Sequence, residues 1–250
     1  MALHIAIKNL STVLTDDEIT AALPAFQKQV SNDFRPIWDL DAVLTFLPKN
    51  QPVPAGAALI VVLDDADQAG ALGYHDLQKN GEPISKVFAK TTAQYGGNWT
   101  VTFSHELLEM LVDPYINLTA LDDHSGRFYA YEVCDAVEAD EFGYMIDGVL
   151  VSDFVLPHWF DEHAVKTRVS SFRSHVHGPF KLASGGYISF LDLRTGQWKQ
   201  ITAQLVPTTD GTSRSARDVS MRSHDAIPRP GSRRERRHRG RNGWITSSEE

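Results

Sequence analysis

The stretch TVTFSHELLEMLVDP, from Thr100 to Pro114, combines the pattern of a helix with side chains that can bind a metal ion. Asp113-Pro114 should end this helix, because proline cannot continue it. Residues four apart lie one above the other on a helix, so His105 and Glu109 project from the same face. One divalent ion can bind both, and Glu106 beside them can then act as general base toward a water molecule. We therefore expect the chemical centre at this HExxE motif.

A motif this short also arises by accident on acidic helices, where the His and Glu side chains are simply solvated. The rest of the helix argues against that alternative, because it is strongly apolar and therefore predicts a core helix. Acidic groups and a histidine on a buried helix need partners or a cleft. The context thus favours metal binding over a solvated face.

Composition predicts a soluble chain with a sizeable core, in one domain or two, since 42% of the 250 residues are apolar. The single cysteine, Cys134, excludes an intramolecular disulfide and suits a reducing compartment. The first residues alternate like a strand and do not form a signal peptide. No apolar run approaches the roughly 20 residues that span a bilayer. We expect a cytoplasmic protein without a membrane partner.

Hydrophobic periodicity and turn residues predict an α+β fold. Thr15 and Glu18 form a capping-box pattern that opens a helix to about residue 30. Before the HExxE helix the expected strands are 3–9, 42–47, 58–63 and a hairpin around Asn80-Gly81 that includes 73–76 and 84–90. After it the expected elements are a strand at 128–134 and hairpins at 144–151 and 187–203.

The string SHELLEMLVDP resembles the HExxH helix of zincin metallopeptidases, with Glu109 in place of the second histidine. In zincins a mixed sheet backs the active-site helix and its edge strand lines the cleft, and this likeness covers residues 1–135. The same string, followed by YEVCD, is also similar to uncharacterised bacterial and phage proteins in which a Glu-containing strand follows an HExxE helix ending in Asp-Pro. The resemblance implies a Zn²⁺-dependent peptidase that acts on peptides, and it raises the prospect of a virion-associated protein.

A third metal ligand should come from outside the helix, because catalytic zinc takes three protein ligands and one water. Glu132 is the first choice, and an edge-strand surface residue is its alternative interpretation. Asp135, His124 and Cys134 are further candidates; a Cys134 thiolate would favour zinc, although a lone strand cysteine is more often a small buried hydrophobe.

Two glutamates and one histidine cancel more of the charge of an ion than three histidines do. The ion is then a weaker Lewis acid. A slow hydrolase, a site for Mn²⁺ or Ca²⁺, and a purely structural site all remain open.

The chain divides by charge into a domain at 1–206 and an arginine-rich tail at 207–250. The tail has ten Arg, no Lys and six Asp or Glu, a net charge of +4. Because the whole chain has a net charge of −8, the domain carries −12. We expect a disordered tail whose densest part binds carboxylates or phosphates. The arginines singled out there are Arg233, Arg234, Arg236 and Arg237.

Three functions follow from these features. The first is a zincin-like metal-dependent hydrolase. The second is a non-catalytic structural or binding component of a larger assembly, for example a phage particle, docked through the tail. The third is nucleic-acid binding through the tail, and a solvated tail without a fixed partner is the simplest alternative. A phosphate-binding glycine loop and a GxSxG motif are both missing from the sequence, which argues against nucleotide and serine-hydrolase chemistry.

Overall fold

The computed structural model describes residues 2–203. The first part of the chain supplies the strands of a five-stranded mixed sheet. The strand order is β2-β1-β3-β5-β4. Strands β2, β1, β3 and β5 run parallel, and β4 pairs with β5 in the antiparallel direction at one edge. The strands are β1 (Leu3–Asn9), β2 (Ala42–Phe46), β3 (Ala58–Leu63), β4 (Gly73–Leu77) and β5 (Pro83–Phe88). The strands predicted from alternation are thus confirmed.

The antiparallel edge follows from local sequence. Asn80-Gly81 lies in the turn between β4 and β5, and Gly81 has a φ of +86°, which a side chain would disfavour. A short turn of this kind can only join antiparallel strands. The other connections of the sheet are long enough to return the chain in the parallel direction.

The first helix begins with the capping box that the sequence predicts. Thr15 accepts a hydrogen bond from the Glu18 amide, and the Glu18 carboxylate accepts one from the Thr15 amide. The helical run passes the expected end near residue 30 through a π-helical turn and ends at Asp39, which adopts a left-handed conformation. Its parts are α1 (Asp16–Lys28), η1 (Gln29–Phe34) and α2 (Arg35–Trp38).

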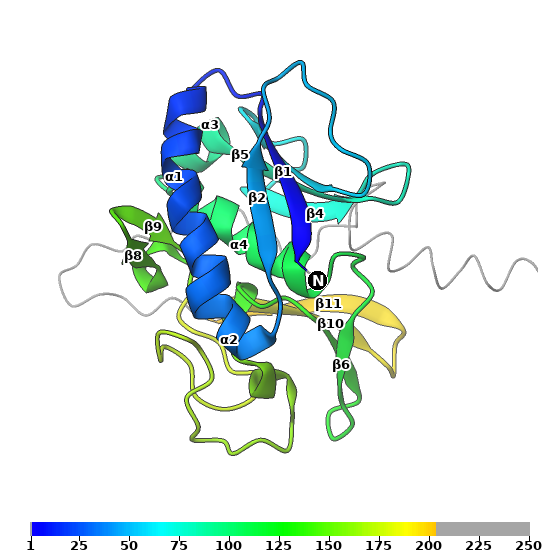
Figure 1. The fold of residues 1–250 in the computed structure, drawn as a ribbon. Helices are drawn as coiled ribbons and strands as arrows, with labels where there is room; N and C mark the ends of the chain where they lie inside the picture. The colour runs from blue at the N-terminus through cyan, green and yellow to red at the C-terminus, as the bar shows by residue number, and fades with distance from the viewer. Residues whose placement is uncertain (1, 204–250) are drawn as a thin grey trace, which may run out of the picture.

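Helix α4 (Trp99–Val112), which follows the short α3 (Ala89–Gln94), is the buried helix that carries the HExxE motif. Asn98 caps it by accepting a hydrogen bond from the Thr100 amide at 3.1 Å. Phe103 of α4 stacks on Phe26 of α1 with ring centroids 4.3 Å apart. Both helices share one apolar cluster with the inward side chains of the sheet, so they pack on the same face (Figure 1).

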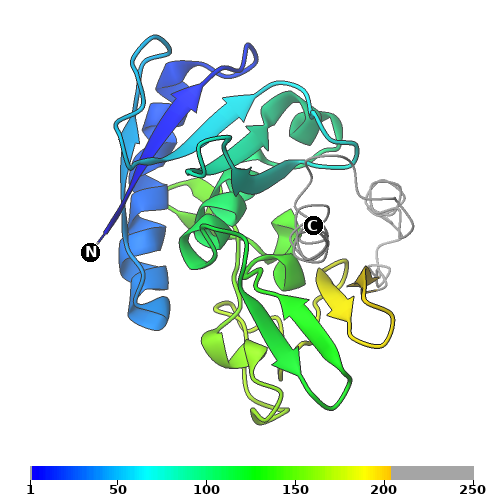
Figure 2. The same ribbon diagram turned by 90° about the vertical axis from the view of Figure 1, so that its right-hand side faces the viewer.

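Two antiparallel sheets follow α4. The larger one has the order β11-β10-β7-β6, and the smaller one is the hairpin β8-β9. Figure 2 shows α4 between the five-stranded sheet above and strands β6 and β7 below. The strands are β6 (Thr119–Asp122), β7 (Arg127–Ala130), β8 (Tyr144–Ile146), β9 (Val149–Val151), β10 (Tyr187–Asp192) and β11 (Gln197–Thr202). Both predicted hairpins are confirmed, and short 3-10 turns fill the connections: η2 (Asp135–Val137), η3 (Asp140–Phe142) and η4 (Pro157–Phe160).

The strand predicted at 128–134 is too long, because β7 ends at Ala130. Beyond it the main chain bonds elsewhere: the Val133 carbonyl accepts from the Val155 amide at 2.7 Å, and the Cys134 amide donates to Glu109 of α4 at 3.2 Å. The chain thus leaves the sheet to contact the helix, which places Glu132 on a loop. Within residues 2–203, none of the helices has the length and apolar character needed to span a membrane.

Candidate metal site

Strand β4 lies directly against α4 because it has a glycine at the point of contact. A Cβ atom on Gly73 would be 2.7 Å from Thr102 Cγ2 and 2.9 Å from both Cγ and Oε1 of Glu106. Only glycine therefore allows this approach without a shift of the helix side chains. Two residues along the strand, on the same face, His75 is brought to the carboxylates of α4.

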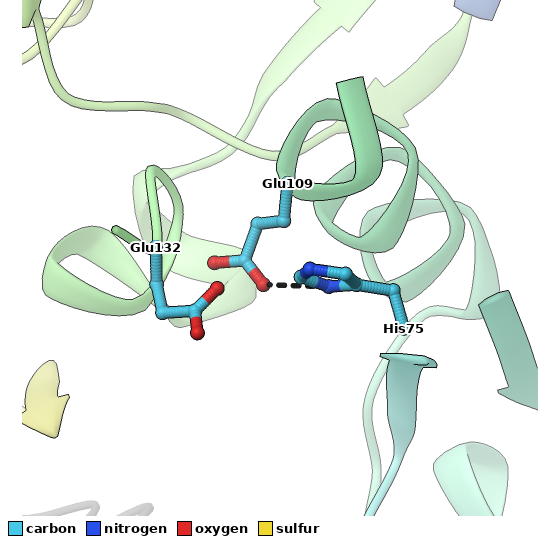
Figure 3. Close-up of side chains that lie close together, drawn as sticks. All are labelled: His75, Glu109 and Glu132. Carbon is cyan, nitrogen blue, oxygen red and sulfur yellow. Dashed lines mark ion pairs between the residues drawn. The ribbon is translucent and has the colours of Figure 1, made fainter. Parts of the chain in front are cut away.

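Glu109 occupies the centre of the site. Its Oε2 atom lies 3.6 Å from His75 Nδ1, and its Oε1 atom lies 3.3 Å from His105 Nε2, one turn earlier on the helix. The same Nδ1 atom of His75 is also 3.6 Å from Glu106 Oε2. Figure 3 shows the His75 ring and the Glu132 carboxylate on either side of Glu109. The two oxygens of one carboxylate thus face two different histidines.

The segment after β7 closes the site from the other side. The Cys134 amide donates to Glu109 Oε1, and in the turn that follows Asp135 Oδ1 lies 3.3 Å from His105 Nε2. His105 therefore stands between two carboxylates of different elements. The Cys134 amide and the Asp135 side chain together hold Glu109 and His105 in place on one face of α4.

Among residues 2–203, two groups of three side chains are close enough for each to hold one ion, and both contain Glu109. In each group the ligand atoms lie within 4.8 Å of one another. The first group is His105, Glu109 and Asp135, and the second is His75, Glu109 and Glu132. All five residues are buried, with His105 the most exposed at 8%.

Burial and charge shift the ionisation of the first group. Burial alone would lower the pKa of His105, but the Glu109 charge and hydrogen bonds to Asp135 and Glu109 raise it well above its usual value. Burial alone would raise the pKa of Glu109, but His105 and His75 hold it well below the usual range. Burial and the Glu109 charge raise the pKa of Asp135 to about 6. The carboxylates around His105 thus favour its protonated form.

The structure brings together most of the residues predicted from the sequence. His105 and Glu109 face each other, Asp135 joins them, and Glu132 joins Glu109 in the second group. Glu106 lies beside His75. The predicted set of His105, Glu109 and Glu132 is therefore distributed over two groups that share one carboxylate.

The side chains of two weaker candidates, His124 and Cys134, belong to neither group. His124 is exposed in the turn between β6 and β7, where its amide donates to Glu162 at 3.4 Å. Cys134 is buried, and burial raises the pKa of its thiol well above the usual range. Its contribution to the site is its amide. The tail arginines Arg233, Arg234, Arg236 and Arg237 lie outside the described residues.

Sequence reasoning missed two residues, His75 and Tyr187. His75 lies on a five-residue strand distant in sequence from the motif, and its alternation with Gly73 places the two on one face of the strand without indicating which element that face meets. Tyr187 starts β10 and hydrogen-bonds to Asp135; burial and the Asp135, Glu138 and Glu109 charges raise its pKa well above the usual range. Its hydroxyl therefore stays protonated.

Comparisons of the chain with protein-family models, with curated proteins and with solved structures give no match.

Proposed function

We propose that the protein is a metal-dependent hydrolase, a zincin-like peptidase that uses the HExxE helix. The observation that carries the proposal is the first group, in which His105, Glu109 and Asp135 offer one ligand atom each within 4.8 Å. An acidic helix face that matched the motif by accident would point to solvent. Here the same face is buried and meets a second histidine and two further carboxylates from other elements.

The donor atoms suit a divalent ion. Bonds from zinc to imidazole nitrogen and carboxylate oxygen are roughly 2.0–2.2 Å long, so ligand atoms around one ion lie no more than about 4.4 Å apart. The group needs only small side-chain adjustments to reach that spacing. A ligand set of one nitrogen and two oxygens suits Zn²⁺. Mn²⁺, a harder ion, is the alternative, and Ca²⁺ is less suited because it prefers oxygen ligands to an imidazole.

A bound ion would polarise a carbonyl group and make a nearby water more acidic. The residues of the chain supply the rest. Glu106 is adjacent to the ligand His105 and can accept the proton of that water and later pass it to the leaving amine. His75 lies beside the Glu106 carboxylate, with Nδ1 3.6 Å from Glu106 Oε2. The apolar packing of α4 keeps the Glu106 and Glu109 side chains in fixed positions.

The fold supports the choice of a peptidase. The resemblance to zincins implies a mixed sheet behind the helix and an edge strand beside it. In this chain the mixed sheet ends in the antiparallel strand β4, and β4 packs against the HExxE segment of α4. Peptides are therefore the proposed substrates.

The test compares Glu106→Gln with the wild type and with Glu141→Gln, which changes an exposed glutamate. We expect Glu106→Gln to keep its metal and to lose about 10²–10⁴-fold in the hydrolysis of a mixed peptide library, because general-base catalysis contributes on that scale. Glu141→Gln should behave like the wild type. Equal activity of the Glu106→Gln and wild-type proteins would contradict the proposal. If removal of 207–250 then abolished an assembly, the structural alternative would be favoured.

A further inference from the structure

The second group around Glu109 is not used by a single ion bound at the HExxE face. His75 and Glu132 are buried, come from different elements, and each offers a ligand atom within 4.8 Å of a Glu109 oxygen. Two groups that share Glu109, each with one imidazole and one carboxylate of its own, require an explanation beyond a mononuclear centre.

We propose that the site takes two divalent cations, with the Glu109 carboxylate bridging them. One ion is bound by His105, Asp135 and Glu109 Oε1, and the other by His75, Glu132 and Glu109 Oε2. The proposal rests on the proposed function for the first ion and adds the second.

The orientation of Glu109 agrees with a bridge. Its Oε1 atom is 3.3 Å from His105 Nε2, and its Oε2 atom is 3.6 Å from His75 Nδ1, so each oxygen already faces the imidazole of its own group. In two-metal hydrolytic sites the ions lie roughly 3.5–4 Å apart, a separation that one carboxylate can bridge. Each ion would have three protein ligands, which leaves a position open for substrate or water.

Charge agrees with the same count. Four buried carboxylates surround the two histidines, namely Glu106, Glu109, Glu132 and Asp135. Their four negative charges equal the four positive charges of two divalent ions, with both imidazoles neutral as metal ligation requires.

The experiment measures metal stoichiometry in the full chain. The protein is equilibrated with Zn²⁺, freed of excess ion, and analysed by mass spectrometry of the metal; Mn²⁺-loaded protein is examined by electron paramagnetic resonance. We expect two ions per chain and a spin-coupled Mn²⁺ pair. His75→Ala and His105→Ala should each retain one ion and lose the coupling, and the exposed-site control His124→Ala should retain two.

The outcomes separate this inference from the proposed function. One ion in the wild type, or two ions in His75→Ala, overturns the bridged pair while leaving the hydrolase intact. Two ions with no effect of Glu106→Gln on hydrolysis overturns the hydrolase alone, and a metal-free wild type overturns both. If His75→Ala does not fold, Glu132→Gln tests the same ion.

Discussion

The two sides of the Glu109 carboxylate are built in different ways. On the Oε1 side, His105 comes from the same helix and lies 3.3 Å from the Glu109 carboxylate, and the Cys134 amide donates to that carboxylate at 3.2 Å. Asp135 in turn lies 3.3 Å from His105 Nε2. On the Oε2 side, His75 comes from a strand of the sheet and lies 3.6 Å from the Glu109 carboxylate. The first side is held by contacts within α4 and with the segment that follows β7. The second depends on how closely β4 approaches α4.

The largest expected effect is the loss of both sides at once in Glu109→Gln. An amide binds cations far more weakly than a carboxylate, so we expect affinity for Zn²⁺ to fall by more than about 100-fold, since changes in the residues around a ligand already reduce it about 10–100-fold. Calorimetric titration measures this, with Glu141→Gln as the matched control. Tight binding of even one ion by Glu109→Gln would show that the two groups are independent.

The pH dependence of binding should differ between the sides. Because the pKa of His105 lies well above its usual value, a proton must leave this residue before the ion binds. Affinity on this side should therefore rise about tenfold per pH unit until the pH passes that pKa, and the slope should steepen below about pH 6, where Asp135 is protonated as well.

Proton release is measured by titration in two buffers of different ionisation enthalpy. The wild type should release one more proton near pH 7 than His105→Ala. Equal release by both proteins would mean that the His105 proton plays no part in binding.

Gly73→Ala should weaken the His75 side selectively. The added methyl would lie 2.7 Å from Thr102 Cγ2 and 2.9 Å from Glu106, which forces β4 away from the helix. We expect a destabilisation of about 1–3 kcal/mol in urea unfolding, as for other overpacked sites, and loss of one ion. Thr102→Ser in the same chain should restore part of the stability. If Gly73→Ala still bound two ions, the selective weakening of the His75 side would be contradicted, because the His75 side chain would have compensated for the shift of β4.

The smallest effect is expected for Cys134→Ala. The thiol stays protonated and the contact with Glu109 is made by the amide, so both ions should remain bound. Removing a small buried side chain should lower the free energy of unfolding by about 1 kcal/mol. Loss of metal in this variant would make the thiol a ligand after all.

The sequence predicted the Oε1 side better than the Oε2 side for a physical reason. His105 and Glu109 are one helical turn apart, and helix periodicity, the Asn98 cap and the Asp113-Pro114 end are all local signals. The strands and the hairpin turns were likewise read from alternation and Asn-Gly or Asp-Gly pairs. The close packing of two elements that are distant in the sequence, such as β4 and α4, has no such local signal.

His75 could not be assigned for that reason, since its role depends on strand order and on the missing Cβ of Gly73. The end of β7 was missed because Tyr131, Glu132 and Val133 continue a strand pattern, whereas the hydrogen bonds from Val155 and to Glu109 draw the chain out of the sheet. Tertiary contacts override alternation at this point.

The position of the ligands along the chain has a consequence for folding. His75 precedes α4, and Glu132 and Asp135 follow β7, so a cation at Glu109 would fasten the early sheet to the late one across long loops. Such a cross-link acts as a disulfide does, by reducing the freedom of the unfolded chain. A protein whose one cysteine has no partner within its own sequence would then rely on the supply of metal for its resistance to unfolding and proteolysis.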